Sequence, residues 1–325
     1  MVVFWIVLAL VVLILLVSFI CYRIVFFATP SAPLVAGEYD LPSGKAYAPF
    51  HDAMRSWQDQ VRALPYETFT ITSFDGLKLS GKYYEYAPGA VTEIMFHGYR
   101  GSAMRDLCGG VHRAFRLGRN VLLVDQRTSN QSQGNTISFG ICEHQDCLGW
   151  VDFMIRHFGP EVELILTGIS MGAATVLMAA GEPLPQNVVG VLADCSYTSA
   201  KAIIHKCAKA MKLPPKIIYP FIRLGAMLFG HFDPEANSPL DAVKRCRVPV
   251  IFFHGQADDF VPSYMSQELF DACASPKKLV IVPHADHGLS FPIAQEAYLQ
   301  NVAEFFTSHG VPTQLVESVP HIPSL

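Results

Sequence analysis

The sequence predicts an α/β fold: a mostly parallel central sheet of about eight strands, with helices on both faces and a helical insertion. Two observations carry this prediction. Short runs rich in β-branched and aromatic residues recur along the chain, and patterns long enough for helices separate most of them. Several runs are apolar throughout, as expected for parallel strands that are buried on both faces and joined by crossover helices.

Composition excludes several classes of protein. The chain has 325 residues, of which 51% are hydrophobic and 16% are charged, so it is not intrinsically disordered and has enough apolar residues for a large core. Lys and Arg number 24 against 28 Asp and Glu, which gives a formal net charge of -4. This balance provides no basic field for a phosphate backbone, so we expect no nucleic-acid partner.

The first predicted element is an apolar segment. Residues 1–22 contain no Asp, Glu, Lys, Arg or His, and a helix of this length would measure about 33 Å, enough for a hydrocarbon core of about 30 Å. We interpret residues 1–27 as a transmembrane helix or signal anchor; a cleavable signal peptide is the alternative, but the segment lacks a basic start and is unusually long for one. The positive-inside rule, applied to the single nearby cation Arg23, places the rest of the chain weakly in the cytoplasm and leaves the side open.

The eight cysteines are scattered and form no CxxC pair. This pattern favours buried thiols on a reducing side over a zinc site or a disulfide framework.

Residues 28–65 are predicted to be a linker and N-terminal extension. The stretch 28–49 is rich in Pro, Gly and Ala and lacks helical or strand periodicity, so we expect globular structure to begin near Phe50. The main domain is predicted over 66–310, with a C-terminal tail over 311–325.

Eight strands are predicted within this domain. The first two would form a hairpin turned at Asp75-Gly76. The predicted strands are 68–74, 77–86, 91–97, 120–126, 162–168, 188–194, 248–255 and 277–283. Sheets of this kind bind ligands beyond the carboxyl ends of their strands, so we expect the chemistry directly after each strand.

The alternation of strands and helices is interrupted once, over residues 197–237. A helical pattern there runs into Pro214-Pro215, which should end it. Lys206, Lys209, Lys212 and Lys216 recur at helical spacing. A solvated basic face is the plain interpretation, and attraction to an anionic lipid surface is the alternative.

A candidate nucleophile follows the strand 162–168. Gly168-Ile169-Ser170-Met171-Gly172 stands between this strand and a run of helix-forming residues. A GxSxG pentapeptide in this context is typical of a nucleophile elbow, where Gly168 and Gly172 permit close backbone approach. The alternative is a glycine-rich turn with a capping serine.

A serine hydroxyl needs a base to take its proton, and the base needs a carboxylate to orient it. Candidates for both follow later strands: Asp258 comes after the strand 248–255, and His287 after the strand 277–283. The residues required for nucleophilic catalysis therefore occur after three separate strands.

These motifs resemble those of α/β-hydrolase-fold serine hydrolases over residues 66–308. The HGxxDxxVP pattern at 254–262 and the DHG at 286–288 match the family's acid and histidine loops. The resemblance implies that Asp258 is the acid and His287 the base, and that no cofactor is needed.

Other residues compete for these roles. Asp259 and Asp194 are alternative acids, since Asp194 also follows a strand, and His284 is an alternative to His287. A metal site formed by His284, Asp286 and His287 with Asp258 has suitable ligand types for zinc but leaves the serine elbow unexplained, so we expect no metal.

The oxyanion of an acyl-transfer reaction needs two donors. The Met171 amide follows the nucleophile, and residues 97–102 resemble the family's HGxxGS loop, which implies that the Tyr99 amide is the second donor. Residues 125–134 depart from the family's DxRGHGxSxG pattern at Thr128 to Asn130, so the conformation of this loop near the site is left unpredicted.

The resulting expectation is a membrane-anchored serine hydrolase that cleaves a carboxylic ester. The resemblance implies that the insertion 197–237 is a lid; its apolar residues favour an apolar acyl group and a small-molecule or lipid-like ester substrate. A serine peptidase or amidase on the same triad is the first alternative. A catalytically idle binding module held at the membrane is the second.

Overall fold

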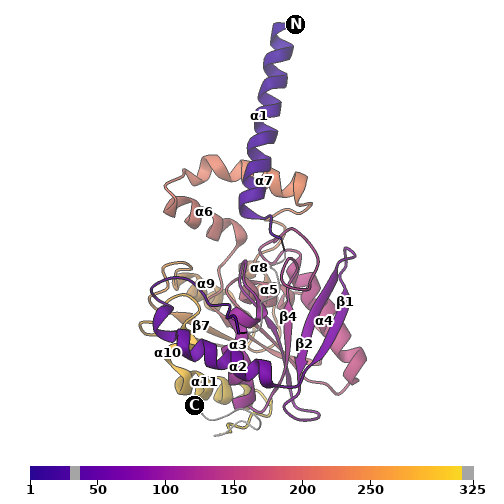
Figure 1. Ribbon diagram of the computed structural model, residues 1–325, viewed down its shortest axis with the longest axis vertical. Helices are drawn as coiled ribbons and strands as arrows, with labels where there is room; N and C mark the ends of the chain where they lie inside the picture. Colours follow the sequence, from indigo (N-terminus) through magenta and orange to yellow (C-terminus); the bar gives the residue numbers. More distant parts are fainter. Residues whose placement is uncertain (30–36, 317–325) are drawn as a thin grey trace.

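The central sheet has eight strands in the order β1-β2-β4-β3-β5-β6-β7-β8 (Figure 1). The computed structural model describes residues 1–29 and 37–316. The strands are β1 (Glu67–Thr72), β2 (Lys78–Tyr84), β3 (Thr92–Phe96), β4 (Asn120–Asp125), β5 (Leu164–Ile169), β6 (Val188–Asp194), β7 (Val250–Gly255) and β8 (Lys277–Val282). β2 pairs antiparallel with β1 and β4, and all other neighbours are parallel. The predicted eight-stranded, mostly parallel sheet is confirmed.

Helices cover both faces of this sheet, and the strand period of two decides which residues they bury. On β3, Met95 packs in one core, whereas Ile94 and Phe96 pack in the other. The first core is closed by α2 (His51–Ala63), α3 (Ala103–Arg116), α10 (Ser290–Ile293) and α11 (Gln295–Ser308). The second is closed by α4 (Glu143–Phe158), α5 (Met171–Ala180), α8 (Pro239–Val243) and α9 (Tyr264–Ala272).

Helix α2 lies inside the stretch predicted to be a linker and extension. It follows a short 3-10 helix, η1 (Ala48–Phe50), and packs against α3. Met54, Trp57 and Val61 are buried on one side of it, because their spacing of three and four residues places them on one helical face. Residues 48–63 of the predicted N-terminal extension are therefore part of the folded domain.

A buried charge cluster lies within the first core. Glu93 on β3 is fully buried, and its carboxylate accepts hydrogen bonds from Arg113, Arg119 and Thr167, with 2.8 Å between Arg119 Nη1 and Glu93 Oε1. Burial raises the pKa of Glu93, but the two guanidinium groups outweigh it and lower this pKa below its usual value. A buried carboxylate needs such partners to remain ionised.

Helix α1 (Val2–Val25) extends away from the domain (Figure 1). Where α1 leaves the domain, it crosses α7 (Pro215–Phe229). The crossing requires a glycine, because a Cβ added at Gly225 would lie 2.3 Å from the carbonyl oxygen of Ser18. Among the described residues, α1 is the one helix long and apolar enough to cross a membrane, with a mean hydropathy of 3.3 over its best window. By length and composition alone, such a helix suits an anchor or a signal sequence.

The insertion after β6 forms α6 (Ala200–Ala210) and α7. Helix α6 ends before Pro214, and Pro215 takes the first turn of α7, where its missing N–H is not needed. The lysines expected on one face have different surroundings: Lys206 donates to the carbonyl of Asp259, whereas Lys209, Lys212 and Lys216 are exposed. Residues 317–325 of the predicted tail lie outside the described residues.

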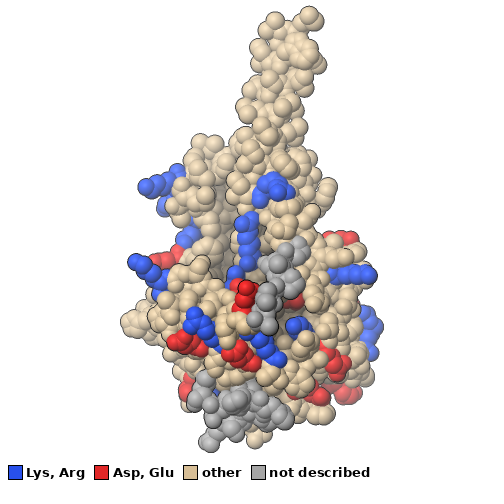
Figure 2. All heavy atoms as spheres, in the orientation of Figure 1, with Lys and Arg blue, Asp and Glu red and all other residues tan. Residues whose placement is uncertain are grey.

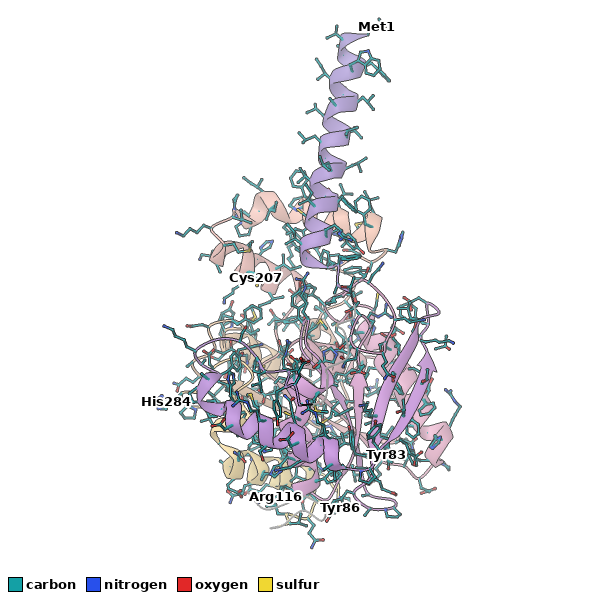
Figure 3. All side chains as sticks on the ribbon, in the orientation of Figure 1. Met1, Tyr83, Tyr86, Arg116, Cys207 and His284 are labelled. Carbon is teal, nitrogen blue, oxygen red and sulfur yellow. The ribbon has the colours of Figure 1, made fainter. Side chains whose placement is uncertain are left out.

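Charged side chains are distributed unevenly along the molecule. Figure 2 shows no Lys, Arg, Asp or Glu on the visible face of the upper part of α1, and blue side chains begin near its base. The apolar side chains of this upper part point outward around the helix, clear of the domain (Figure 3), and are exposed, as Phe4 and Trp5 illustrate with 64% and 60% exposure.

Candidate active site

Ser170 stands on a strained turn between β5 and α5. Its backbone has φ 55° and ψ -116°, a conformation that is uncommon for a residue with a side chain. Close approach on both sides requires the flanking glycines: a Cβ at Gly168 would lie 2.1 Å from the Gly172 oxygen, and one at Gly172 would lie 1.9 Å from the Phe96 oxygen. This geometry is that of a nucleophile elbow.

The structure brings Ser170, His287 and Asp258 together at the carboxyl edge of the sheet. Ser170 Oγ lies 2.9 Å from His287 Nε2, and His287 Nδ1 lies 2.7 Å from Asp258 Oδ2. The three side chains thus form a continuous hydrogen-bonded chain, although 117 sequence positions separate the serine from the histidine. With Nδ1 donating to the carboxylate, Nε2 is free to accept the serine proton.

Asp258 is buried and well supplied with donors. Its Oδ1 accepts hydrogen bonds from the amides of Phe260 and Val261, at 2.9 and 2.7 Å. Burial raises the pKa of Asp258, but the hydrogen bonds from His254 and His287 outweigh it and hold this pKa at about 2. The carboxylate therefore stays ionised at neutral pH.

The competing acids have other surroundings. Asp194 is buried and accepts hydrogen bonds from Ser290 Oγ (2.9 Å) and Tyr298 Oη (3.2 Å). Asp259 is exposed beside the buried Asp258. Of the three candidate acids, Asp258 is the one that the structure places in a hydrogen bond with His287.

Of the residues of the alternative metal site, His287 and Asp258 are brought together, whereas His284 and Asp286 do not join them in a candidate metal group. His284 is exposed, and Asp286 accepts from the backbone amide of His287. In the described part of the chain, the group whose donor atoms could hold a metal ion is Cys195, Asp258 and His287, all within 4.8 Å of one another. Burial, followed by the nearby carboxylates, raises the pKa of the Cys195 thiol well above its usual value, which disfavours the thiolate that a metal requires.

The loop 97–102 passes beside the nucleophile. A Cβ added at Gly98 would lie 3.5 Å from Cβ of Ser170. No hydrogen bond described within residues 1–29 and 37–316 uses the amide of Tyr99 or of Met171. Met171 is the first residue of α5, and amides in a first helical turn have no partner within the helix. Both predicted oxyanion donors are therefore available.

The loop 125–134, where the chain departs from the family pattern, is tied to this region by side chains. Asn130 Nδ2 donates to Asp125 Oδ1 at 2.7 Å, and Ser129 Oγ donates to the Gly101 carbonyl at 3.2 Å. Of the replaced residues, Ser129 thus contacts the loop 97–102, and Asn130 stabilises the loop 125–134 itself.

A cavity of about 260 Å³ opens beside Ser170 and His287. Part of its wall comes from the N-terminal extension, whose Tyr47 donates to the His287 carbonyl at 2.9 Å. Sequence reasoning missed this contribution, although the apolar spacing of Met54, Trp57 and Val61 could have indicated α2. The other lining residues are Pro42, Ser43, Met54 of α2, Gly98, Tyr99, Arg105, Asp106, Ile169, Phe260 and Gly288.

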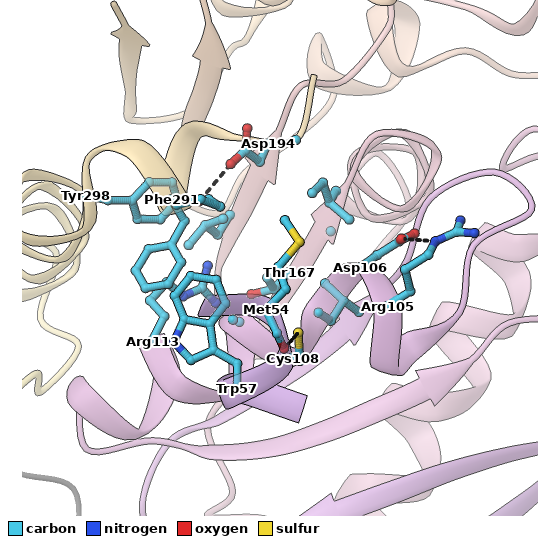
Figure 4. A pocket seen from close by; sticks show the side chains of 18 residues that line it. Met54, Trp57, Arg105, Asp106, Cys108, Arg113, Thr167, Asp194, Phe291 and Tyr298 are labelled. Carbon is cyan, nitrogen blue, oxygen red and sulfur yellow. Dashed lines mark hydrogen bonds and ion pairs between the residues drawn. The ribbon is translucent and has the colours of Figure 1, made fainter. Parts of the chain in front are cut away.

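A second cavity of about 70 Å³ adjoins the first and is shown in Figure 4. Trp57, Arg113 and Asp194 are among the side chains that line it. The Nε1 of Trp57 and the Nε of Arg113 are buried without a hydrogen-bond partner among the described residues. The space and these donors suit ordered water better than an acyl chain.

No protein-family model matches the chain. Its curated relatives include the uncharacterised protein YqkD of Bacillus subtilis, which is 27% identical over 267 residues, covering 81% of this chain and 85% of YqkD. The protein bem46 of Schizosaccharomyces pombe is 23% identical over 228 residues, covering 68% of this chain and 69% of bem46.

Solved structures resemble the whole domain. The esterase Pf2001 of Pyrococcus furiosus matches with a TM-score of 0.64 at 21% identity, covering 87% of this chain and 98% of the esterase. The α/β hydrolase GrgF of a Penicillium species matches with a TM-score of 0.59 at 18% identity, covering 76% of this chain and 99% of GrgF. A puromycin-hydrolysing peptidase of Mycobacterium tuberculosis gives 0.56 at 15% identity, covering 75% of this chain and 39% of the peptidase. The fold is therefore the α/β-hydrolase fold.

Proposed function

We propose that this protein is a membrane-anchored serine hydrolase that cleaves a carboxylic ester with an apolar acyl group. The observation that carries the proposal is the hydrogen-bonded chain from Ser170 through His287 to the buried Asp258, at the carboxyl edge of an α/β-hydrolase sheet. The likeness to an esterase supports it at the level of the fold.

The reaction proceeds by acyl transfer. Ser170 Oγ attacks the ester carbonyl while His287 Nε2 takes its proton, and Asp258 stabilises the resulting imidazolium. The amides of Tyr99 and Met171 donate to the oxyanion of the tetrahedral intermediate. His287 then protonates the departing alkoxide. Water next attacks the acyl-enzyme while His287 takes its proton, and His287 returns this proton to Ser170 Oγ as the carboxylic acid leaves.

The preference for an apolar ester is supported by the surface around α1. Ile217, Met227 and Leu228 on α7 are 66%, 48% and 44% exposed, beside a helix with the composition of a membrane span. The crossing at Ser18 lies within this apolar helix, so α7 packs against part of the candidate membrane span itself. A fully inserted α1 would therefore immerse α7 in the membrane interface and bring ester substrates from the lipid phase to the lid.

The first test is hydrolysis of p-nitrophenyl esters from acetate to laurate by the full chain in detergent micelles, beside Ser170→Ala. We expect the variant to lose about 10⁴-fold or more in kcat, and the wild type to prefer longer acyl chains. Equal rates for wild type and variant would refute the serine mechanism. Equal turnover of short and long esters by the wild type would refute the apolar acyl preference.

A serine peptidase or amidase is the second candidate, because the similar structures include peptidases. An active-site fluorophosphonate separates it from an idle module. Labelling of Ser170 without ester hydrolysis would favour an amide substrate, and absence of labelling would favour the idle module.

A further inference from the structure

The last residues of α1 and those that follow, 22–28, are built into the domain. We call this segment the foot of α1. Phe26 is fully buried, with ring-centroid distances of 5.7 Å to Phe139 and 5.2 Å to Phe232. Its carbonyl accepts from the Ile137 amide at 2.8 Å, and the Ala28 amide donates to the Asn135 carbonyl at 3.0 Å. The foot is therefore held by core packing and by backbone pairing, unlike a flexible tether.

The final carbonyls of α1 accept hydrogen bonds from the loop 97–102. A helix leaves its last carbonyls without partners inside the helix. Here Tyr99 Oη donates to the Val25 carbonyl at 2.7 Å, and Arg100 Nη2 donates to those of Ile24 and Phe27 at 2.8 and 3.1 Å. The guanidinium group also stands at the negative end of the helix dipole.

The same loop carries the proposed oxyanion donor. The Tyr99 amide can donate to an oxyanion at Ser170 only if the loop keeps its position beside Ser170. Within this loop, Arg100 has a left-handed backbone conformation with φ 51°. A residue with a side chain rarely keeps such a conformation without external contacts. Among the described residues, the side-chain hydrogen bonds of Tyr99 and Arg100 all go to the foot of α1.

The base of the loop is fixed independently. The Gly98 amide donates to Asp106 Oδ2 at 2.9 Å, and Ser102 Oγ donates to Asp40 Oδ2 at 2.6 Å. These bonds hold the two ends of the loop, whereas its tip is held by the foot of α1 and by Arg105, whose Nη2 donates to the Arg100 carbonyl at 3.1 Å. Releasing the tip should therefore move the Tyr99 amide without unfolding the loop.

We propose that Tyr99 and Arg100 are positioning residues through which the foot of α1 sets the oxyanion donor of the active site. The proposal rests on the serine-hydrolase function proposed above. The N-terminal helix then does more than attach the enzyme to a membrane: its last carbonyls complete the active site.

The test uses Tyr99→Phe in the full chain, in detergent micelles, on the water-soluble ester p-nitrophenyl butyrate. This change removes only the hydroxyl that bonds to Val25. We expect kcat to fall about tenfold with little change in KM, because a misplaced oxyanion donor weakens the transition state more than the bound ester. Tyr197→Phe is the matched control, since it removes a hydroxyl that donates to the Phe139 carbonyl at 3.0 Å in the same aromatic cluster, and it should keep kcat.

Substitutions of Arg100 provide an independent test of the proposal. Arg100→Ala should lower kcat in the same way, and Arg100→Lys should restore part of it, because an ammonium group still donates to a helix carbonyl. Wild-type kcat in both Tyr99→Phe and Arg100→Ala, beside an inactive Ser170→Ala, would overturn this proposal while the hydrolase function stands. A rise in KM with unchanged kcat would also overturn it, and an inactive wild type would refute both proposals.

Discussion

Replacing Asp258 by Asn tests how the acid of the proposed triad supports the base. Burial raises the pKa of Asp258, but the hydrogen bonds from His254 and His287 outweigh it and lower this pKa from 3.8 to about 2. This lowering of nearly two pH units, at about 1.36 kcal/mol per unit, stabilises the carboxylate over its neutral form by about 2 to 3 kcal/mol. A free energy of this size corresponds to about 100-fold in a rate constant.

Asp258→Asn removes the charge that stabilises the imidazolium and also changes the group facing His287 Nδ1. We therefore expect kcat to fall by about 100-fold from the lost charge, and by up to about 10⁴-fold where the amide NH₂ favours the wrong tautomer of the imidazole.

The assay is kcat on p-nitrophenyl butyrate at neutral pH for the full chain in micelles. Asp194→Asn is the matched control, because Asp194 also follows a strand but bonds to Ser290 and Tyr298 and not to His287. The control should keep kcat near the wild-type value. Retention of more than about a tenth of kcat in Asp258→Asn, or an equal loss in Asp194→Asn, would refute the assignment.

Four further predictions follow from the structure. Since the pKa of Asp258 is lowered to about 2, this carboxyl stays ionised in the mildly acidic range, so log(kcat/KM) should fall there with a slope of one, and a slope of two would contradict this. Phe26→Ala should lower the free energy of unfolding in micelles by about 3 to 5 kcal/mol, because it empties a fully buried site, whereas the exposed Phe4→Ala should change it by less than about 0.5 kcal/mol. Glu93→Gln should lower it by about 3 kcal/mol or more, since two buried guanidinium groups lose their carboxylate; no change in denaturant midpoint would count against this. Ile217→Asp should slow hydrolysis of a long-chain ester in vesicles but not of p-nitrophenyl acetate, and equal effects on the two substrates would argue against immersion of α7.

Local patterns in the sequence indicate much of the fold and of the candidate site. The strands are recognisable because buried parallel strands need continuous apolar runs, and Ser170 is recognisable because the elbow requires Gly168 and Gly172 where the backbone comes close. The position of Asp258 in its loop follows from the family pattern. The different roles of Asp258 and Asp194 cannot be read from the strand pattern, because both residues follow strands. Only the folded chain shows that Asp258, and not Asp194, lies beside His287.

The sequence by itself determined the order of strands and helices, the apolar N-terminal segment and the candidate triad residues, since each depends on neighbours a few positions apart. Only the tertiary structure decided that α2 forms a wall of the cavity at Ser170 and that the foot of α1 accepts hydrogen bonds from Tyr99 and Arg100. The physical reason is sequence distance: the hydrogen bonds to the foot of α1, for example, join residues 73 to 76 positions apart through backbone carbonyls, which every residue type carries.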